Sequence, residues 1–158
     1  SLHDALPICN VFVGGGSKDT TSGCAALYNC IAGYANGDTN SVGGVAITGS
    51  INAAGGNITL NGLGSMTNST SGDGIRLTGT GGSALTTSGT GTMTLNGIAT
   101  GLHNGIRIDT ANLVAGSGLI TLTGTTNSAS SYAGSRLEGS ASITSTAGNP
   151  LTGRAAWR

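Results

Sequence analysis

Three arginines recur at nearly constant spacing and are the residues best placed to do chemistry together. Arg76, Arg107 and Arg136 stand 31 and 29 residues apart (107 − 76 and 136 − 107). Asp109 and Glu138 follow the second and third arginine by two residues, on the same side of an extended strand. A guanidinium column of this kind can bind the carboxylates of acidic sugars. The competing interpretation is a solvated ladder of ion pairs, each contributing about 0.2–1 kcal/mol to stability.

The remaining ionisable residues do not form a recognisable active site. Polysaccharide-cleaving enzymes place paired carboxylates on one face, whereas here only Asp109 and Glu138 are expected to be neighbours. We expect His103 to be a surface residue of a loop and Asp73 to stabilise a turn. Calcium is coordinated by about six to eight oxygen ligands, which a single aspartate cannot supply. We therefore predict no catalytic residue, no cofactor and no metal site.

The three cysteines all lie in the first fifth of the chain, at positions 9, 24 and 30. Cys24 and Cys30 could close a small disulfide loop, and two unpaired thiols are the alternative. No C-x-x-C pattern indicates a metal site.

The arginines belong to a longer sequence repeat. In each repeat, one segment precedes the segment that contains the arginine and another follows it, with turns rich in Gly, Asn and Ser between them. A period of about 30 residues built from short alternating strands is typical of a solenoid in which each repeat is one coil. We predict an all-β parallel β-solenoid of about four coils with three short strands per coil. The first segments are Ile58–Gly62, Met93–Gly97 and Ile120–Gly124. The second segments are Gly74–Thr78, Gly105–Asp109 and Gly134–Glu138. The third segments are Ala84–Thr86, Asn112–Val114 and Ser142–Thr144.

The alternation of aliphatic and polar residues in the first segment of each repeat predicts which side chains enter the core. The aliphatic residues should point inward, and Thr59, Thr94 and Thr121 should form an outward column. Such a column could bind ice, but Asn61 and Asn96 interrupt the paired Thr-x-Thr ranks that an ice-binding face needs. We expect these two asparagines to form a side-chain amide ladder. The expected inward residues are Ile58, Leu60, Met93, Leu95, Ile120 and Leu122.

Composition favours a narrow aliphatic core and excludes several classes of partner. The chain of 158 residues contains 30 glycines, only 3% aromatic and 8% charged residues, and has no net charge. The six basic residues are scattered, so we expect no nucleic-acid partner. No apolar run approaches the roughly 18–20 residues that span a bilayer, so we expect no membrane insertion by this segment.

The sequence divides into four parts. Residues 1–10 are expected to be a non-native leader, because residues 1–8 resemble the translated read-through of a sequencing adapter. Residues 11–43 are expected to form a degenerate N-terminal coil in which Leu27 and Tyr28 take the place of Ile58. Residues 44–148 are the repeats, and residues 149–158 an irregular tail. Because neither end has an evident polar cap, we expect a piece of a longer array.

Runs such as Gly56–Gly62 and Gly118–Gly124, of the form Gly-x-Ile-Thr-Leu-x-Gly, carry a family resemblance. Over roughly Gly44 to Gly148 the chain resembles the shafts of filamentous-haemagglutinin-type exoproteins and related autotransporter passengers. The resemblance implies a right-handed parallel β-helix. It also implies secretion by a two-partner or autotransporter route and a place in the stalk of an adhesin.

We therefore expect a non-catalytic shaft segment of a large bacterial adhesin, secreted or held at the outer-membrane surface. Its expected partners are the flanking coils of the full-length protein and a surface glycan or protein on a host or neighbouring cell. Receptor contact is expected in the variable loops 63–73, 98–104 and 125–133, with Arg76, Arg107, Arg136, Asp109 and Glu138 as weak candidates for ligand contact. The alternatives are a carbohydrate-binding or polysaccharide-degrading β-helix and an ice-binding solenoid.

Overall fold

The structure is a computed structural model. It describes residues 10–14, 33–37, 43–64, 72–79, 84–99, 102–126, 132–146 and 155–157. The regular elements of these residues are all β-strands, which pair in parallel into three sheets.

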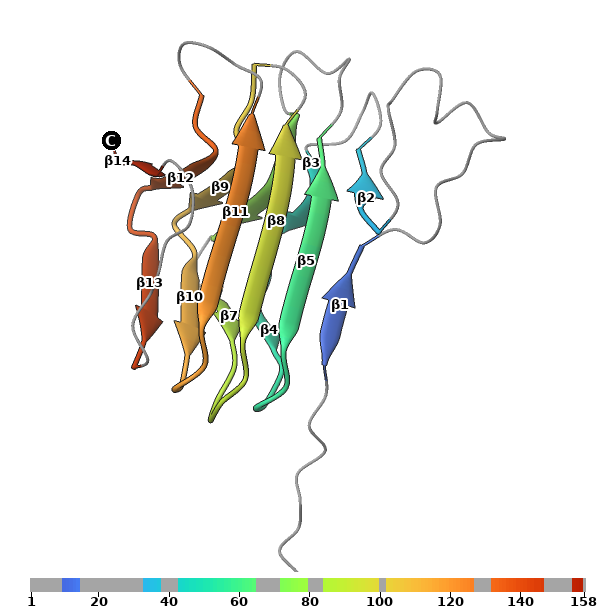
Figure 1. The fold of residues 1–158 in the computed structure, drawn as a ribbon. Coiled ribbons are helices and arrows are strands. Elements are labelled where there is room, and N and C mark those ends of the chain that lie inside the picture. The colour runs from blue at the N-terminus through green and yellow to red at the C-terminus, as the bar shows by residue number, and fades with distance from the viewer. Residues whose placement is uncertain are drawn as a thin grey trace, which may run out of the picture.

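The first sheet, called sheet A, contains the longest strands and faces the viewer in Figure 1. Its strand order is β1-β5-β8-β11, and β2 pairs with the far end of β5. Equivalent residues of successive coils stand on one another, as in Leu60, Leu95 and Leu122. The strand bounds are Val11–Val13 (β1), Ala35–Asn36 (β2), Ile58–Leu63 (β5), Met93–Ala99 (β8) and Ile120–Thr126 (β11).

The second segment of each coil forms a strand of sheet B, and the third segment forms a strand of sheet C. Sheet B has the order β14-β12-β9-β6-β3 and sheet C the order β13-β10-β7-β4. Sheet B comprises Gly43–Ile47 (β3), Asp73–Thr78 (β6), Ile106–Asp109 (β9), Ser135–Glu138 (β12) and Ala155–Trp157 (β14). Sheet C comprises Ile51–Asn52 (β4), Ala84–Thr86 (β7), Asn112–Ala115 (β10) and Ser142–Ser145 (β13).

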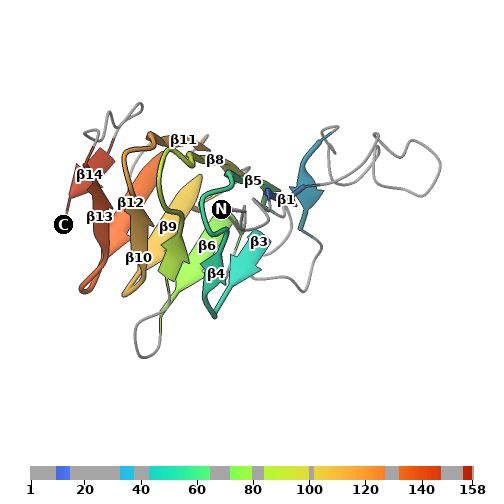
Figure 2. The same cartoon turned by 90° about the horizontal axis from the view of Figure 1, so that it is seen from below.

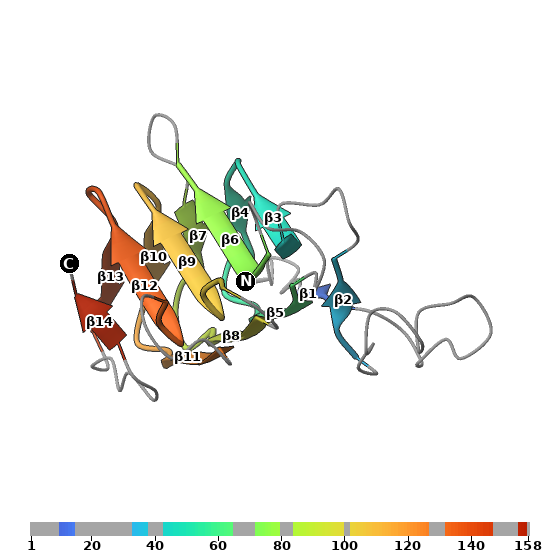
Figure 3. The same cartoon turned by 90° about the horizontal axis from the view of Figure 1, so that it is seen from above.

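The chain visits the three sheets in the same order in each coil and advances along one axis. Sheet A strands run upward in Figure 1 and sheet C strands run downward, while Figure 3 shows sheet B crossing between them. Viewed from below, the strands of sheet B follow one another along the axis from β3 to β14 (Figure 2). This path is a right-handed parallel β-solenoid of about four coils, and the predicted fold is confirmed.

The core is a stack of aliphatic side chains, as the alternation predicts. Ile58, Leu60, Met93, Leu95 and Ile120 have no exposed surface. Sheets B and C add columns such as Ile75 over Ile106 and Leu85 over Leu113. Each fully buried side chain of this size contributes about 1.5–3 kcal/mol relative to an exposed one. The threonine column 59, 94 and 121 lies on the outer face of sheet A.

The first coil differs from the prediction in its first strand. Val11 and Val13 pair with Ile58 and Leu60, the places that we assigned to Leu27 and Tyr28, and Ala35 then pairs with Gly62. The first coil therefore carries an insertion in the middle of its sheet A strand, which a count of residues back from Val45 cannot reveal. Leu27 and Tyr28 lie outside the described residues. The other first-coil assignments are confirmed, with Val45 on Ile75 and Ile51 on Leu85.

The tail also contains more structure than expected. Residues 149–158 were predicted to be irregular, yet β14 pairs in parallel with β12, with Ala155 beside Ser135 and Trp157 beside Leu137. The sequence of Ala155–Trp157 does not resemble the earlier sheet B strands, so the sequence repeat does not predict this strand.

Sheets A and B meet at a narrow edge, which we call the glycine corner. A Cβ atom on Gly97 of sheet A would lie 2.1 Å from the carbonyl oxygen of Gly105, and one on Gly105 would lie 2.3 Å from the amide nitrogen of Thr125. No side chain fits between backbones at this distance. The repeated glycines are therefore required by close approach of the two sheets. The corner is formed by Gly62, Gly97 and Gly124 in sheet A and by Gly74, Gly105 and Gly134 at the start of sheet B.

We predict that Gly97→Ala destabilises the protein by about 2–3 kcal/mol, as overpacking of a rigid site does. Gly49→Ala is the matched control, because a Cβ atom at Gly49 has no neighbour within 4 Å among the described residues. Thermal unfolding followed by circular dichroism measures the difference. Equal melting temperatures for the two variants would contradict the close approach.

Candidate functional site

A polar cleft of about 340 Å³ opens on the outer face of sheet B, beside the glycine corner. Its walls come from the sheet B strands and from the residues that lead into them. The lining residues are Asp73, His103, Asn104, Arg107, Tyr132, Arg136 and Glu138.

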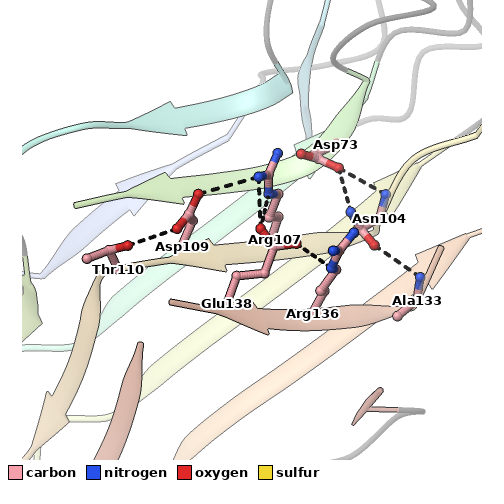
Figure 4. A network of polar contacts seen from close by, with 8 residues as sticks. All are labelled: Asp73, Asn104, Arg107, Asp109, Thr110, Ala133, Arg136 and Glu138. Atoms are coloured by element: carbon pink, nitrogen blue, oxygen red, sulfur yellow. Dashed lines mark hydrogen bonds and ion pairs between the residues drawn. The ribbon is translucent and has the colours of Figure 1, made fainter. Parts of the chain in front are cut away.

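The rear wall of the cleft is a hydrogen-bonded column that runs through three coils. Asp73, Asn104 and Ala133 each precede a glycine of sheet B. The backbone nitrogen and Nδ2 of Asn104 donate to Oδ1 of Asp73, at 2.9 and 3.2 Å. The backbone nitrogen of Ala133 donates to Oδ1 of Asn104 at 3.1 Å. Figure 4 shows this column, with the second carboxylate oxygen of Asp73 pointing away from Asn104.

An aromatic pair forms the side wall. The rings of His103 and Tyr132, which precede the column residues by one position, have centroids 5.8 Å apart and are tilted by 47°. His103 is buried, whereas Tyr132 remains 36% exposed. Oγ1 of Thr126 donates to the backbone oxygen of His103 at 2.7 Å, which ties the end of β11 to this segment. The prediction that His103 is a surface residue was wrong.

The opposite wall is the arginine ladder. Nε and Nη2 of Arg107 donate to Oε2 of Glu138 at 3.1 and 2.8 Å, and Nη2 approaches Oδ2 of Asp109 at 3.4 Å. Nε of Arg136 forms an ion pair with Oε1 of Glu138. These side chains are half-buried, so they lie less fully in solvent than we expected. Figure 4 shows Glu138 between the two arginines.

The structure separates the predicted ligand residues into two groups. Arg107, Arg136 and Glu138 line the cleft, whereas Arg76 and Asp109 do not. Asp109 accepts hydrogen bonds from Arg107 and from the hydroxyl of Thr110. Arg76 stands beside Arg107 in register, and its buried Nε has no hydrogen-bond partner among the described residues. In the described part of the chain, the acidic residues Asp109 and Glu138 form ion pairs with Arg107 and Arg136 and not with Arg76.

The asparagine ladder on sheet A is confirmed. Nδ2 of Asn96 donates to Oδ1 of Asn61 at 2.9 Å, and Nδ2 of Asn61 donates to the backbone oxygen of Gly33 at 3.1 Å. Thr123 continues the same column in the next coil.

Other predictions concern residues outside those described. The three cysteines lie there, as do the tips of the variable loops at 65–71, 100–101 and 127–131. In the described ranges, no group of three His, Cys, Asp or Glu residues is arranged to hold a metal ion. Within the same ranges, no helix has the length and apolar character of a membrane span.

Sequence reasoning missed Asn104, Tyr132 and the buried state of His103. Alignment of the coils on Gly74, Gly105 and Gly134 places Asp73 over Asn104 and His103 over Tyr132, and this signal was available. The residues of each column differ in type. A stack of unlike residues is not detected as a repeat.

No protein-family model, curated protein or solved structure matches this chain. The candidate site therefore rests on its own geometry.

We predict that Asn104→Ala lowers the free energy of unfolding by about 1–3 kcal/mol, because it leaves the buried backbone nitrogen of Ala133 without its acceptor and removes one of the two hydrogen bonds to Oδ1 of Asp73. The control is Asn112→Ala, which removes only an exposed hydrogen bond from Ser142 and should cost about 0.5 kcal/mol or less. Chemical denaturation measures both values. If the two variants unfold alike, the buried column does not stabilise the corner.

Proposed function

We propose that this chain is a structural, non-catalytic segment of the shaft of a large bacterial adhesin. The observation that carries the proposal is that equivalent positions of successive coils pair in register in all three sheets. A shaft needs length and stiffness. A stack in which each coil contacts only its neighbours supplies both and can be extended by adding coils.

The outer coils of the described stack bury their apolar side chains less fully than the middle coils. Core residues of the middle coils, such as Leu95 and Leu113, are fully buried. The equivalent residues of the outer coils, Val13 at one end and Ile143 at the other, are only partly buried. Further coils at either end would cover these apolar side chains and pair the outer strand edges, which otherwise are sites of aggregation.

Composition is compatible with secretion through an outer-membrane pore. A chain with few charges can cross in extended form and then fold coil by coil outside the cell. We propose an extracellular or outer-membrane-associated location, reached by a two-partner or autotransporter route as in the filamentous-haemagglutinin-type proteins that the repeats resemble. The flanking coils and a glycan or protein on another cell are the proposed partners.

The carboxylates of the cleft favour a structural function over hydrolysis. Oδ1 of Asp73 accepts two hydrogen bonds from Asn104, and both oxygens of Glu138 pair with arginines. Carboxylate oxygens that already accept hydrogen bonds or ion pairs from the protein are less available to a substrate. Ice binding is the weaker alternative. An ice-binding face needs two adjacent columns of threonine, and in the second column two of the positions are asparagines, Asn61 and Asn96.

Immunogold electron microscopy of intact bacteria that produce the full-length protein tests the proposal. An antibody against this chain should label thin surface filaments whose length grows by about 4.8 Å per coil of the sequence. An antibody against a cytoplasmic protein is the control and should label only permeabilised cells. Label confined to the cell interior, or to compact surface particles, would overturn the shaft.

A further inference from the structure

We propose that the polar cleft on sheet B binds a neutral pyranose ring, presented by a glycan. The cleft combines an aromatic wall, a wall of paired charges and a fixed hydrogen-bonded column. This inference goes beyond the shaft role and does not depend on it.

The charges of the cleft favour a neutral ligand over an acidic one. The two lining arginines, Arg107 and Arg136, are balanced by two lining carboxylates, so their formal charges cancel (2 − 2 = 0). A carboxylate placed beside Glu138 would meet a like charge and compete for arginines that already have a partner. The acidic sugar expected from the sequence is therefore the poorer ligand.

Donors and acceptors stand together in the cleft, as a polyhydroxylated ligand requires. Arg136 uses Nε for Glu138, and its terminal nitrogens have no partner among the described residues and extend toward Asn104 (Figure 4). Asp73 uses Oδ1 for Asn104, and its second oxygen points away from that residue. A sugar hydroxyl can accept from the guanidinium and donate to the carboxylate.

Tyr132 supplies the apolar part of the contact. Its ring is packed at a tilt against His103 on one side and is partly exposed. An aromatic ring held in this way offers a flat apolar surface at low entropic cost, which suits the C–H face of a pyranose. The volume of about 340 Å³ is at the small end of the roughly 300–1,000 Å³ of ligand pockets.

Other ligand classes fit less well. A peptide needs apolar side-chain pockets or an unpaired strand edge, whereas the cleft lies on the face of sheet B between paired strands. A phosphate or nucleic acid needs an excess of positive charge, which the cleft lacks. Apolar small molecules need predominantly apolar walls.

The test uses the full chain and the methyl pyranosides of glucose, galactose, mannose and N-acetylglucosamine, screened by saturation-transfer NMR and titrated by calorimetry. At least one neutral pyranoside should bind. Tyr132→Ala and Arg136→Gln should each weaken its binding about tenfold or more, which corresponds to a loss of about 1.4 kcal/mol or more, as expected for a hot-spot contact.

Tyr34→Ala and Arg76→Gln are the matched controls, because both residues lie outside the cleft, and the affinity should be unchanged. Circular dichroism must show that all four variants keep the melting transition of the parent, which separates loss of binding from loss of fold. The proposal is overturned if the folded chain binds none of the four pyranosides, or if the cleft variants bind like the controls. Tighter binding of methyl glucuronide than of methyl glucoside would also overturn it, in favour of an anion site. The shaft role survives each of these results.

Discussion

The fold depends on one constraint: a residue must stand on its equivalent in the next coil, at the spacing of a parallel ladder. Leu60, Leu95 and Leu122 satisfy it in the core, and Asn61 and Asn96 satisfy it on the surface. Shifting one strand by one residue would exchange every buried side chain with an exposed one. The glycine corner tightens the same constraint, because at Gly97 and Gly105 the two sheets approach too closely for any side chain.

Variation in length lies outside the ladder, in the connections between sheets and in the insertion within the first coil's sheet A strand. In the passage from sheet A to sheet B, the chain leaves the ladder after one glycine of the corner and returns before the next, and the intervening length changes from coil to coil. The cleft is a product of this arrangement. Its ladder wall, Arg107 and Glu138, is set by the repeat, while its other walls, His103 and Tyr132, are set by residues that differ between coils. A regular scaffold thus positions an irregular site.

The sequence was sufficient for the sheets but only partly for the site. Alternation and the recurrence of Gly-x-Arg determine which residues are buried and which coils pair, because each strand repeats its neighbour. The pairing of Val11 with Ile58 could not be predicted, since an insertion separates it from Ala35 and no repeat spans it. His103 contacts Tyr132 of the next coil, and because the two residues differ in type their stacking is not visible as a repeat.

The central claim, that successive coils stack in parallel and in register, is tested most directly by solution NMR of the labelled chain. The account predicts nuclear Overhauser contacts between the backbone protons of Leu95 and those of both Leu60 and Leu122, together with slow amide exchange at all three positions. It predicts the same pattern for Ile106 with Ile75 and Ser135. Contacts that place Leu95 beside residues one position out of register, or fast exchange throughout this column, would contradict it.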